Sequence, residues 1–362
     1  MADNELAPNG DPGPKTISDL GAKRRAVTSE RRAATLADVA KAAGVSISTA
    51  SKALNGRSDV SDGTRRRVIA AAEELSFSPN TLARSLLTGR TGTVGLITHD
   101  LEGRFSIPLL MGVEDAFGLN KVSVLLCDAR GDGIRERYQI GVLLERRVDG
   151  LIIVGARPDP RPSLGHDLPV PVVYAYAPSI DERDISVTSD NVGAGRMAVE
   201  HLIACGRRRI GVISGDPTYG ASGDRVRGAE EALREAGLTM AGDHAVFGSW
   251  SEEWGRGAAT ALLGRCPDTD AVLCGSDQIG RGVVEAVRDF GRRVPEDVAV
   301  MGHDNWEILV AGCRPPLTSV DMNLEYLGRR AARRLSEAME GHPTAGVEKV
   351  GCRLVVRAST AG

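Results

Sequence analysis

The chain has 362 residues, of which 42% are hydrophobic and 26% charged, and its formal net charge is −3. This composition is typical of a globular protein, and the length suffices for two or three domains. No run approaches the roughly 18 apolar residues of a membrane helix, and the acidic, proline-rich start is unlike a signal peptide. We therefore expect a cytoplasmic protein without a membrane partner. The six cysteines are scattered without CxxC or Cys/His clusters, which predicts free thiols, no metal site and no metal cofactor.

Residues 1–33 contain proline, glycine and charge without an apolar period, and we expect a disordered tail. Its arginine pairs could add phosphate contacts or could simply be solvated. Residues 23–90 hold 13 Lys and Arg against 6 Asp and Glu, a surplus of seven positive charges in a chain that is negative overall. A basic segment of this kind, separable from an acidic remainder, favours contact with nucleic acid.

Residues 35–55 read TLADVAKAAGVSISTASKALN and predict two short helices joined at Gly44. A third helix is expected from Ser61, and its apolar stripe, which would cover the first two helices, ends at Leu75. The arrangement is that of a helix-turn-helix, although paired helices also occur in ordinary helical cores. Ile47 and Ser48 lie on the face of the second helix that the core does not need, so this face can enter a major groove.

Pro79 can begin a short hinge helix that Gly89 ends. It is too short to be stable alone, so it should order against DNA or a second copy of itself. From Gly92 onward, Val/Ile/Leu-rich runs alternate with helical stretches, which predicts doubly wound α/β folding in two lobes with a crossing near residue 190. Ligands in such folds bind beyond the carboxyl ends of the strands.

A dinucleotide-binding enzyme is the first alternative, because Gly193, Gly195 and Ala198 fit GxGxxA and Asp216 follows about 20 residues later. We expect no such site, since no continuous apolar strand leads directly into these glycines. GxSxG, GxxxxGK[ST] and HExxH patterns are also missing from the sequence. Nothing in the sequence therefore requires an enzyme.

The helix-turn-helix, the hinge and the two-lobed part together resemble the lactose-repressor (LacI-type) family of bacterial transcriptional regulators over roughly residues 35–360. The motifs that carry the resemblance are SPNTLARSLLTG, SGDRVRGAEEAL, CGSDQIGRGV, PEDVAVMGHDN and PPLTSVDMN. It implies an N-terminal all-α helix-turn-helix head with a hinge helix, followed by a periplasmic-binding-protein-like effector domain of two lobes with doubly wound parallel sheets. The expected boundaries are 1–33 for the tail, 34–78 for the head, 79–91 for the hinge, 92–190 with 321–341 for the first lobe, and 191–320 with 342–362 for the second lobe.

The resemblance assigns operator contacts to residues of the head and hinge. Lys52 stands where the family most often has arginine, which weakens the expectation of bidentate guanine readout. Asn55 and Ser61 could also act as helix caps. Leu86 matches a leucine that wedges into the minor groove, unless it only packs hinge against hinge. The full DNA-binding set is Thr35, Ile47, Ser48, Thr49, Ser51, Lys52, Asn55, Ser61, Thr64, Ala83 and Leu86.

The resemblance places a small polar effector, expected to be a sugar although a nucleoside stays open, between the lobes. Arg225 matches an arginine that holds hydroxyls or a carboxylate, and Asp304 an acid that accepts from the ligand. These two residues could instead form an interlobe salt bridge, and Trp250 could be an ordinary core residue. Asp277 is expected to be structural. The effector-binding set is Phe105, Tyr176, Arg225, Trp250, Ser276 and Asp304.

The function implied is that of a cytoplasmic, homodimeric repressor that binds a near-palindromic double-stranded operator. The effector would change the angle between the lobes and thereby decide whether the hinge helices form. Whether it releases DNA or promotes binding depends on the lobe arrangement it prefers, so a regulator that activates or needs a corepressor is an alternative. Alternatives from other classes are an NAD-dependent enzyme and a solute-binding protein; the second would need an export signal.

Overall fold

The computed structural model describes residues 34–54, 57, 59–77, 89–101, 103–118 and 122–361. The chain divides into two units, one ending at Leu87 and the other beginning at Thr88, and each is described by itself. The predicted tail, most of the hinge, and Asn55, Ala83 and Leu86 lie outside the described residues.

The first unit contains three short helices, α2 (Leu36–Ala42), α3 (Ile47–Leu54) and α4 (Asp62–Glu74). Gly44 adopts φ 65° between α2 and α3, as the predicted sharp turn requires. Small side chains fill the centre, so the helices approach closely; the fully or nearly fully buried ones include Val39, Ala50, Ala53 and Val68.

Leu75 was expected to complete the apolar stripe of the third helix, and this expectation is wrong. Helix α4 ends at Glu74, and Leu75 is the C-cap residue with 37% of its surface exposed. The apolar period therefore continues one residue beyond the helix that it predicts.

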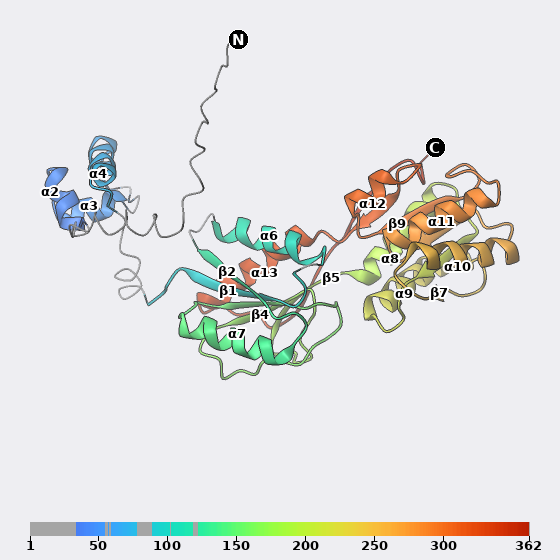
Figure 1. Ribbon diagram of the computed structural model, residues 1–362, viewed down its shortest axis with the longest axis horizontal. Helices are drawn as coiled ribbons and strands as arrows, with labels where there is room; N and C mark the ends of the chain where they lie inside the picture. Colours follow the sequence, from blue (N-terminus) through green and yellow to red (C-terminus); the bar gives the residue numbers. More distant parts are fainter. Residues whose placement is uncertain are drawn as a thin grey trace, which may run out of the picture. The chain divides into compact units, whose positions relative to one another are not determined.

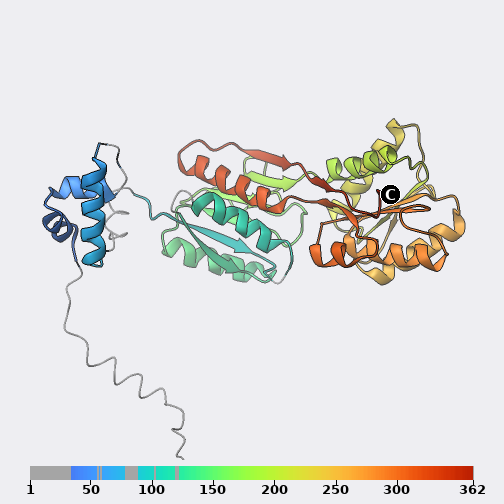
Figure 2. The same ribbon diagram turned by 90° about the horizontal axis from the view of Figure 1, so that it is seen from above.

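The second unit contains two lobes, each built on a six-stranded sheet (Figures 1 and 2). In the first sheet the strand order is β11-β5-β4-β3-β1-β2, and in the second it is β12-β10-β9-β8-β6-β7. Neighbouring strands pair in parallel, except that β12 is antiparallel to β10. The strands are β1 (Thr93–Thr98), β2 (Ser123–Asp128), β3 (Leu151–Val154), β4 (Val172–Ala175), β5 (Ile185–Ser189), β6 (Ile210–Ser214), β7 (Val246–Phe247), β8 (Ala271–Cys274), β9 (Ala299–His303), β10 (Thr318–Asp321), β11 (Gly346–Val350) and β12 (Arg353–Val355).

Helices cover both faces of each sheet, so the central strands are buried on both sides, as their unbroken apolar runs predict. In the first lobe, α6 (Ser106–Gly118) and α13 (Leu324–Met339) lie on one face and α7 (Gly133–Glu145) on the other (Figure 1). In the second lobe, alternate residues of the same strands pack against two different helix pairs. Those helices are α8 (Asn191–Ala204) with α9 (Gly220–Glu235), and α10 (Glu252–Arg265) with α11 (Asp277–Asp289); α12 (Glu307–Gly312) follows β9.

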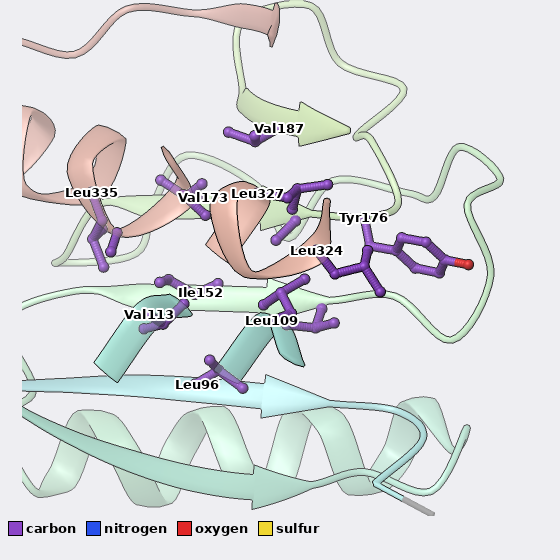
Figure 3. Packing of buried hydrophobic residues seen from close by; sticks show 14 of the residues in the cluster. Leu96, Leu109, Val113, Ile152, Val173, Tyr176, Val187, Leu324, Leu327 and Leu335 are labelled. Atoms are coloured by element: carbon purple, nitrogen blue, oxygen red, sulfur yellow. The ribbon is translucent and has the colours of Figure 1, made fainter. Parts of the chain in front are cut away.

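The largest core cluster of the first lobe lies between its sheet and the helices α6 and α13 (Figure 3). Leu109 from α6 and Leu327 from α13 meet Ile152 and Val173 from the strands there. Figure 3 also shows the ring of Tyr176 extending beyond the end of β4, with its hydroxyl directed away from the other side chains of the cluster. The core therefore anchors the base of a side chain whose polar end lies at the edge of the sheet.

Within the described residues the chain passes between the lobes three times, after β5, after β10 and after β11. The crossing predicted near residue 190 is confirmed. The expectation that 342–362 lies wholly in the second lobe is wrong, because Gly346–Val350 pairs with β5 in the first sheet. Only the segment that begins with β12 returns to the second lobe, where it pairs with β10.

Three helix pairs meet through reciprocal glycine contacts. A Cβ atom at Gly112 of α6 would lie 1.9 Å from the carbonyl oxygen of Glu325 in α13, and one at Gly328 of α13 would lie 2.1 Å from that of Leu109. The equivalent pairs are Gly195 with Gly228 between α8 and α9, and Gly255 with Gly282 between α10 and α11. Each backbone thus packs directly on its partner's backbone, at a separation that no larger residue permits.

These contacts predict opposite effects for alanine at two glycines. Gly195→Ala should lower the free energy of unfolding by about 1–3 kcal/mol, because the added methyl group forces α8 away from α9. Gly223→Ala in α9 is the matched control, since a Cβ there meets nothing within 4 Å, and it should raise stability by up to about 1 kcal/mol. Urea unfolding monitored by circular dichroism measures both. Equal stability changes in the two variants would contradict the packing role of Gly195.

Candidate functional site

The exposed face of α3 is the part of the first unit that is free to read a surface. Ile47 is 55% exposed and Ser48 is also exposed, as predicted. Thr49 is partly committed to the start of the helix, because its backbone N–H donates to Ser46 Oγ at 3.1 Å and the two hydroxyls lie 2.8 Å apart. Ser51 is half-buried. The exposed residues among those predicted to read bases are therefore Ile47, Ser48 and Lys52.

Lys52 forms an ion pair that the sequence interpretation missed. Its Nζ lies 2.6 Å from Asp59 Oδ2, and both side chains are about half exposed, at 50% and 53%. The hydrogen bond from Lys52 is the largest cause that lowers the pKa of Asp59. Exposed pairs of this kind are weak, so Lys52 can exchange Asp59 for a phosphate or a base. The pair nevertheless neutralises the positive charge of Lys52, which is the one lysine in α3.

Two of the predicted DNA-contacting hydroxyls, those of Thr35 and Ser61, act as local helix caps. Thr35 Oγ1 accepts from the N–H of Asp38 at 3.3 Å, and the N–H of Thr35 donates to Asp38 Oδ2 at 2.8 Å, which completes a capping box. Ser61 Oγ accepts from Thr64 N at 3.4 Å and lies 3.0 Å from Thr64 Oγ1. Capping explains these residues without DNA, and their phosphate contacts stay predictions.

A cavity of about 610 Å³ lies where the carboxyl ends of both sheets converge. It falls within the range of small-molecule sites. The lining comes from the loops after β1, β3, β4, β6, β7, β8 and β9, where ligands of doubly wound sheets bind. Five of the six predicted effector-binding residues line this cavity: Phe105, Tyr176, Arg225, Trp250 and Asp304.

Arg225 is buried, and hydrogen bonds fix its orientation. Its Nε donates to Asn191 Oδ1 at 3.0 Å and its Nη1 to the carbonyl oxygen of Gly275 at 2.8 Å. Its Nη2 donates to the sulfur of Met322 at 3.8 Å, and a thioether sulfur is a weak acceptor. The guanidinium is therefore held rigidly, with one nitrogen poorly satisfied at the wall of the cavity.

Asp304 pairs with an arginine, but not with Arg225. Arg104, from the loop after β1 in the first lobe, donates to Asp304 Oδ2 in the second lobe. Its guanidinium carbon lies 4.7 Å from the ring centre of Phe105 and 4.6 Å from that of Trp306. Burial raises the pKa of Asp304, while Arg225 and Arg104 act in the opposite direction. The interlobe salt bridge considered for Arg225 is thus formed by Arg104, which the sequence interpretation missed.

The turn that carries Asp304 has strained backbone torsions, with φ 96° at Asp304 and 51° at Asn305. Buried Asp277 holds this turn, because its carboxylate accepts from Trp306 N at 2.7 Å and from Ser319 Oγ at 2.6 Å. Burial, and then the neighbouring Asp304 carboxylate, raise the pKa of Asp277. Asp277 therefore positions the acidic wall of the cavity and does not face it, which agrees with the structural role expected for it.

Ser276 is not a lining residue of the cavity, and the prediction that it contacts the effector is not supported. The residue is fully buried, and its Oγ accepts from Ile279 N at 3.3 Å as the N-cap of α11. Gln278, two residues later, lines the cavity instead. The S/T-x-x pattern ahead of an apolar stripe is the sequence signal that could have identified the cap.

Aromatic side chains face the cavity from both lobes. Phe105 and Tyr176 stack at 5.8 Å in the first lobe, and Tyr219 meets Trp250 edge-on at 5.5 Å in the second. Burial raises the pKa of Tyr176, so its phenol stays a neutral donor. The buried Nε1 of Trp250 has no hydrogen-bond partner among the described residues. The cavity thus offers flat apolar surfaces beside polar donors.

A second contact joins the lobes on another side of the cavity. Asp159 of the first lobe accepts from Gly220 N at 2.6 Å and so supplies a cap for α9, whose own N-cap residue Tyr219 supplies none. Arg157 lies over the Tyr219 ring at 3.8 Å and donates to the carbonyl oxygen of Thr218 at 3.0 Å. Polar contacts therefore connect the lobes on both sides of the cavity.

The glycines of the GxGxxA pattern have other roles. The fully buried strand β5 leads into this segment, but its sequence, ISVTS, is not a continuous apolar run. A stronger reason against a dinucleotide site is that Asp190 caps α8 by accepting from Gly193 N at 3.0 Å, which places a carboxylate where a pyrophosphate would bind. Gly195, meanwhile, packs against the backbone of Arg225.

Neither a membrane-spanning element nor a metal centre emerges from the described part of the chain. Its helices are too short or too polar to cross a bilayer. Its His, Cys, Asp and Glu side chains form no group of three or more that could hold a metal ion.

Two family models match the chain. Residues 35–80 match that of the bacterial regulatory proteins, lacI family, and residues 199–360 match that of the periplasmic binding protein-like domain. The chain is 37% identical to the HTH-type transcriptional regulator CelR of Thermobifida fusca, over 88% of this chain and 96% of that protein. It is 31% identical to the HTH-type transcriptional repressor CytR of Escherichia coli strain K12, over 91% and 97%.

Solved structures of bacterial transcriptional regulators are also similar to this chain. A complex of CelR with cellobiose is similar at a TM-score of 0.59 and 34% identity, covering 90% of this chain and 99% of that one. The lac repressor dimer bound to operator and the anti-inducer ONPF is similar at a TM-score of 0.67 and 26% identity, covering 91% and 100%.

The cap assigned to Ser276 predicts a loss of stability on substitution. Ser276→Ala should lower the free energy of unfolding by about 1 kcal/mol or more, because a buried N–H of α11 loses its acceptor. Gln278→Ala, on the same turn but facing the cavity, should change stability by less than about 0.5 kcal/mol. Denaturant titration of both variants is the measurement. Unchanged stability in Ser276→Ala would show that the cap is not needed.

Proposed function

Because this chain belongs to the lacI family of bacterial regulatory proteins, we propose that it is a transcriptional repressor whose operator binding is controlled by a sugar. The observation that carries the proposal is the interlobe cavity, in which Arg225, Asp304 and aromatic rings meet at the carboxyl ends of both sheets. The proposal places the protein in the cytoplasm, where DNA is, and assigns it no catalytic reaction.

The chemistry of the cavity supports a sugar effector. Flat aromatic faces suit the apolar faces of pyranose rings, and the indole N–H of Trp250 and the Nη2 of Arg225 are donors that lack good acceptors. A sugar hydroxyl can accept from Nη2 of Arg225, whereas the indole N–H of Trp250 is enclosed by protein atoms. The volume of about 610 Å³ has room for more than one ring, and the relative CelR has been solved with the disaccharide cellobiose. We therefore propose a disaccharide as the effector.

We also propose that the chain acts as a homodimer on a near-palindromic operator. A lac repressor dimer on its operator is among the similar structures. In this chain, β2 is an edge strand of the first sheet, and Leu126 on it and Met111 on the neighbouring helix α6 are exposed. A second copy covering this edge would remove unpaired strand edges and exposed apolar surface together.

The effector site is tested by Arg225→Ala. Cellobiose, maltose, lactose and a nucleoside serve as probes in a thermal-shift titration, followed by a mobility-shift assay with DNA from upstream of the chain's own gene. We expect a disaccharide to raise the Tm of the native protein and to change its DNA affinity. Arg225→Ala should lose both responses while it still binds DNA.

Arg227→Ala is the matched control for Arg225→Ala. It lies on the same helix, is 57% exposed and pairs only locally with Asp224, so its response to the disaccharide should equal that of the native protein. A native protein that responds to the nucleoside and to no sugar would overturn the choice of effector. Loss of DNA binding in Arg225→Ala would mean that this arginine is structural.

The DNA-reading role of α3 is tested through the Lys52–Asp59 pair. Asp59→Asn should raise operator affinity by about two- to tenfold at low salt, because it frees the Lys52 ammonium group to contact DNA. The gain should disappear in a Lys52→Met background, which is a double-mutant cycle. Asp62→Asn, in the same unit, controls for the loss of one charge. A mobility-shift assay measures affinity, and two chains per operator are expected.

If Asp59→Asn and Asp62→Asn raise affinity equally, or if the gain persists without Lys52, then only net charge matters and Lys52 does not contact DNA. A stoichiometry of one chain per operator would contradict the proposed dimer.

A further inference from the structure

A second cavity of about 280 Å³ lies beside the effector cavity. The two cavities share four lining residues, namely Arg104, Phe105, Asp304 and Trp306. Beyond this common wall, the smaller cavity is lined by the segment that links β10 to α13, including Asp321 and Asn323, and by Arg353. The two cavities are therefore adjacent, and these shared side chains lie between them.

The shared wall is held in place by Arg104. The side chain spans from the first lobe to Asp304 in the second, and its guanidinium lies between the rings of Phe105 and Trp306. A further bond runs from Nη1 to Gln278 Oε1 at 3.5 Å. Asp304 is only 5% exposed, so withdrawal of Arg104 would leave a buried carboxylate without its partner, which is costly. The ion pair therefore keeps the Arg104 side chain in one position between the two cavities, where an unpaired exposed side chain would move freely.

The smaller cavity has the polar lining that a sugar unit needs. Asp321 accepts from Arg353 at 2.6 Å, and Asn323 adds an amide at the start of α13. Carboxylate, guanidinium and amide groups together can both donate to and accept from ring hydroxyls. Phe105 and Trp306 line this cavity too, so an aromatic surface is present on its side of the wall.

We propose that Arg104 sets the length of saccharide that the cleft accepts. With its side chain in place, a short saccharide occupies the larger cavity, and the wall excludes further units. Without it, the two cavities join into one elongated groove that receives a longer chain. The proposal rests on the sugar effector proposed above and adds a specificity-determining residue to that site.

Two variants separate the bulk of Arg104 from its charge. Arg104→Ala removes both, whereas Arg104→Met removes the charge and keeps an unbranched side chain of similar length. Cellobiose, cellotriose and cellotetraose are titrated into each full-length protein by isothermal calorimetry. We expect the native protein and Arg104→Met to bind the disaccharide at least about tenfold more tightly than the tetrasaccharide. Arg104→Ala should bind the tetrasaccharide at least about tenfold more tightly than the native protein does.

Three other outcomes would contradict different parts of the proposal. If Arg104→Ala keeps the native length preference, the wall does not set length, although the sugar effector stands. If Arg104→Met accepts the longer chains as well as Arg104→Ala does, the ion pair with Asp304 and not the bulk of the side chain excludes them, and exclusion by bulk is wrong. If the native protein binds no saccharide, the proposed sugar effector fails, and the length proposal fails with it.

Arg104→Ser guards against a variant that does not fold. Its hydroxyl and an entering water can donate toward Asp304, which limits the cost of the unpaired carboxylate. Folding is checked by thermal unfolding before titration. Arg104→Ser should show the same gain in tetrasaccharide affinity as Arg104→Ala, and a native length preference in a folded Arg104→Ser protein would overturn the proposal.

Discussion

The arrangement of the effector unit depends on helices that touch backbone to backbone. Reciprocal glycines at 112 and 328, 195 and 228, and 255 and 282 let three helix pairs approach until a Cβ would overlap a carbonyl oxygen. Close pairing fixes how far apart the helices lie and therefore which strand residues they cover. It also reaches the site directly, because Gly195 packs on the carbonyl of Arg225. Gly195, which has no side chain, therefore helps to set the position of Arg225, the arginine that we propose binds the effector.

The lobes themselves are joined differently. Each has its own apolar core, whereas the recorded contacts across the cleft are polar: Arg104 with Asp304, Asp159 with Gly220 N, and Arg157 with Thr218 and Tyr219. Polar contacts of this kind can be exchanged for contacts with a ligand at modest net cost, while an apolar interface cannot. We therefore expect a ligand to shift the lobes through its different affinity for two arrangements, without disturbing either core.

Much of this fold follows from the sequence because its signals are local. Unbroken Val/Ile/Leu runs marked the strands, and Gly44 marked the turn in the head. Pairings between distant segments carried no local signal, so β11, which lies within the expected range 342–362, was assigned to the wrong lobe. The cleft shows the same division. Motif position predicted two residues that line the cavity, Arg225 and Asp304, but Arg104 was missed because its partner is 200 residues away. Ser276 caps α11, whereas Gln278, two residues later, lines the cavity.

The hydrogen bonds of Arg225 connect the proposed ligand site to the segments of chain that pass between the lobes. Its Nε donates to the amide oxygen of Asn191, the first residue of α8. The backbone N–H of the preceding residue, Asp190, donates to the carbonyl oxygen of Val350 at the end of β11. Two of the three crossings between the lobes therefore meet within one or two bonds of this arginine. A ligand atom that bonds to Nη2 acts on a guanidinium that cannot move without moving Asn191. The proposed effector site and two of the segments that cross between the lobes are for this reason connected directly, and the proposed switch requires no separate relay between them.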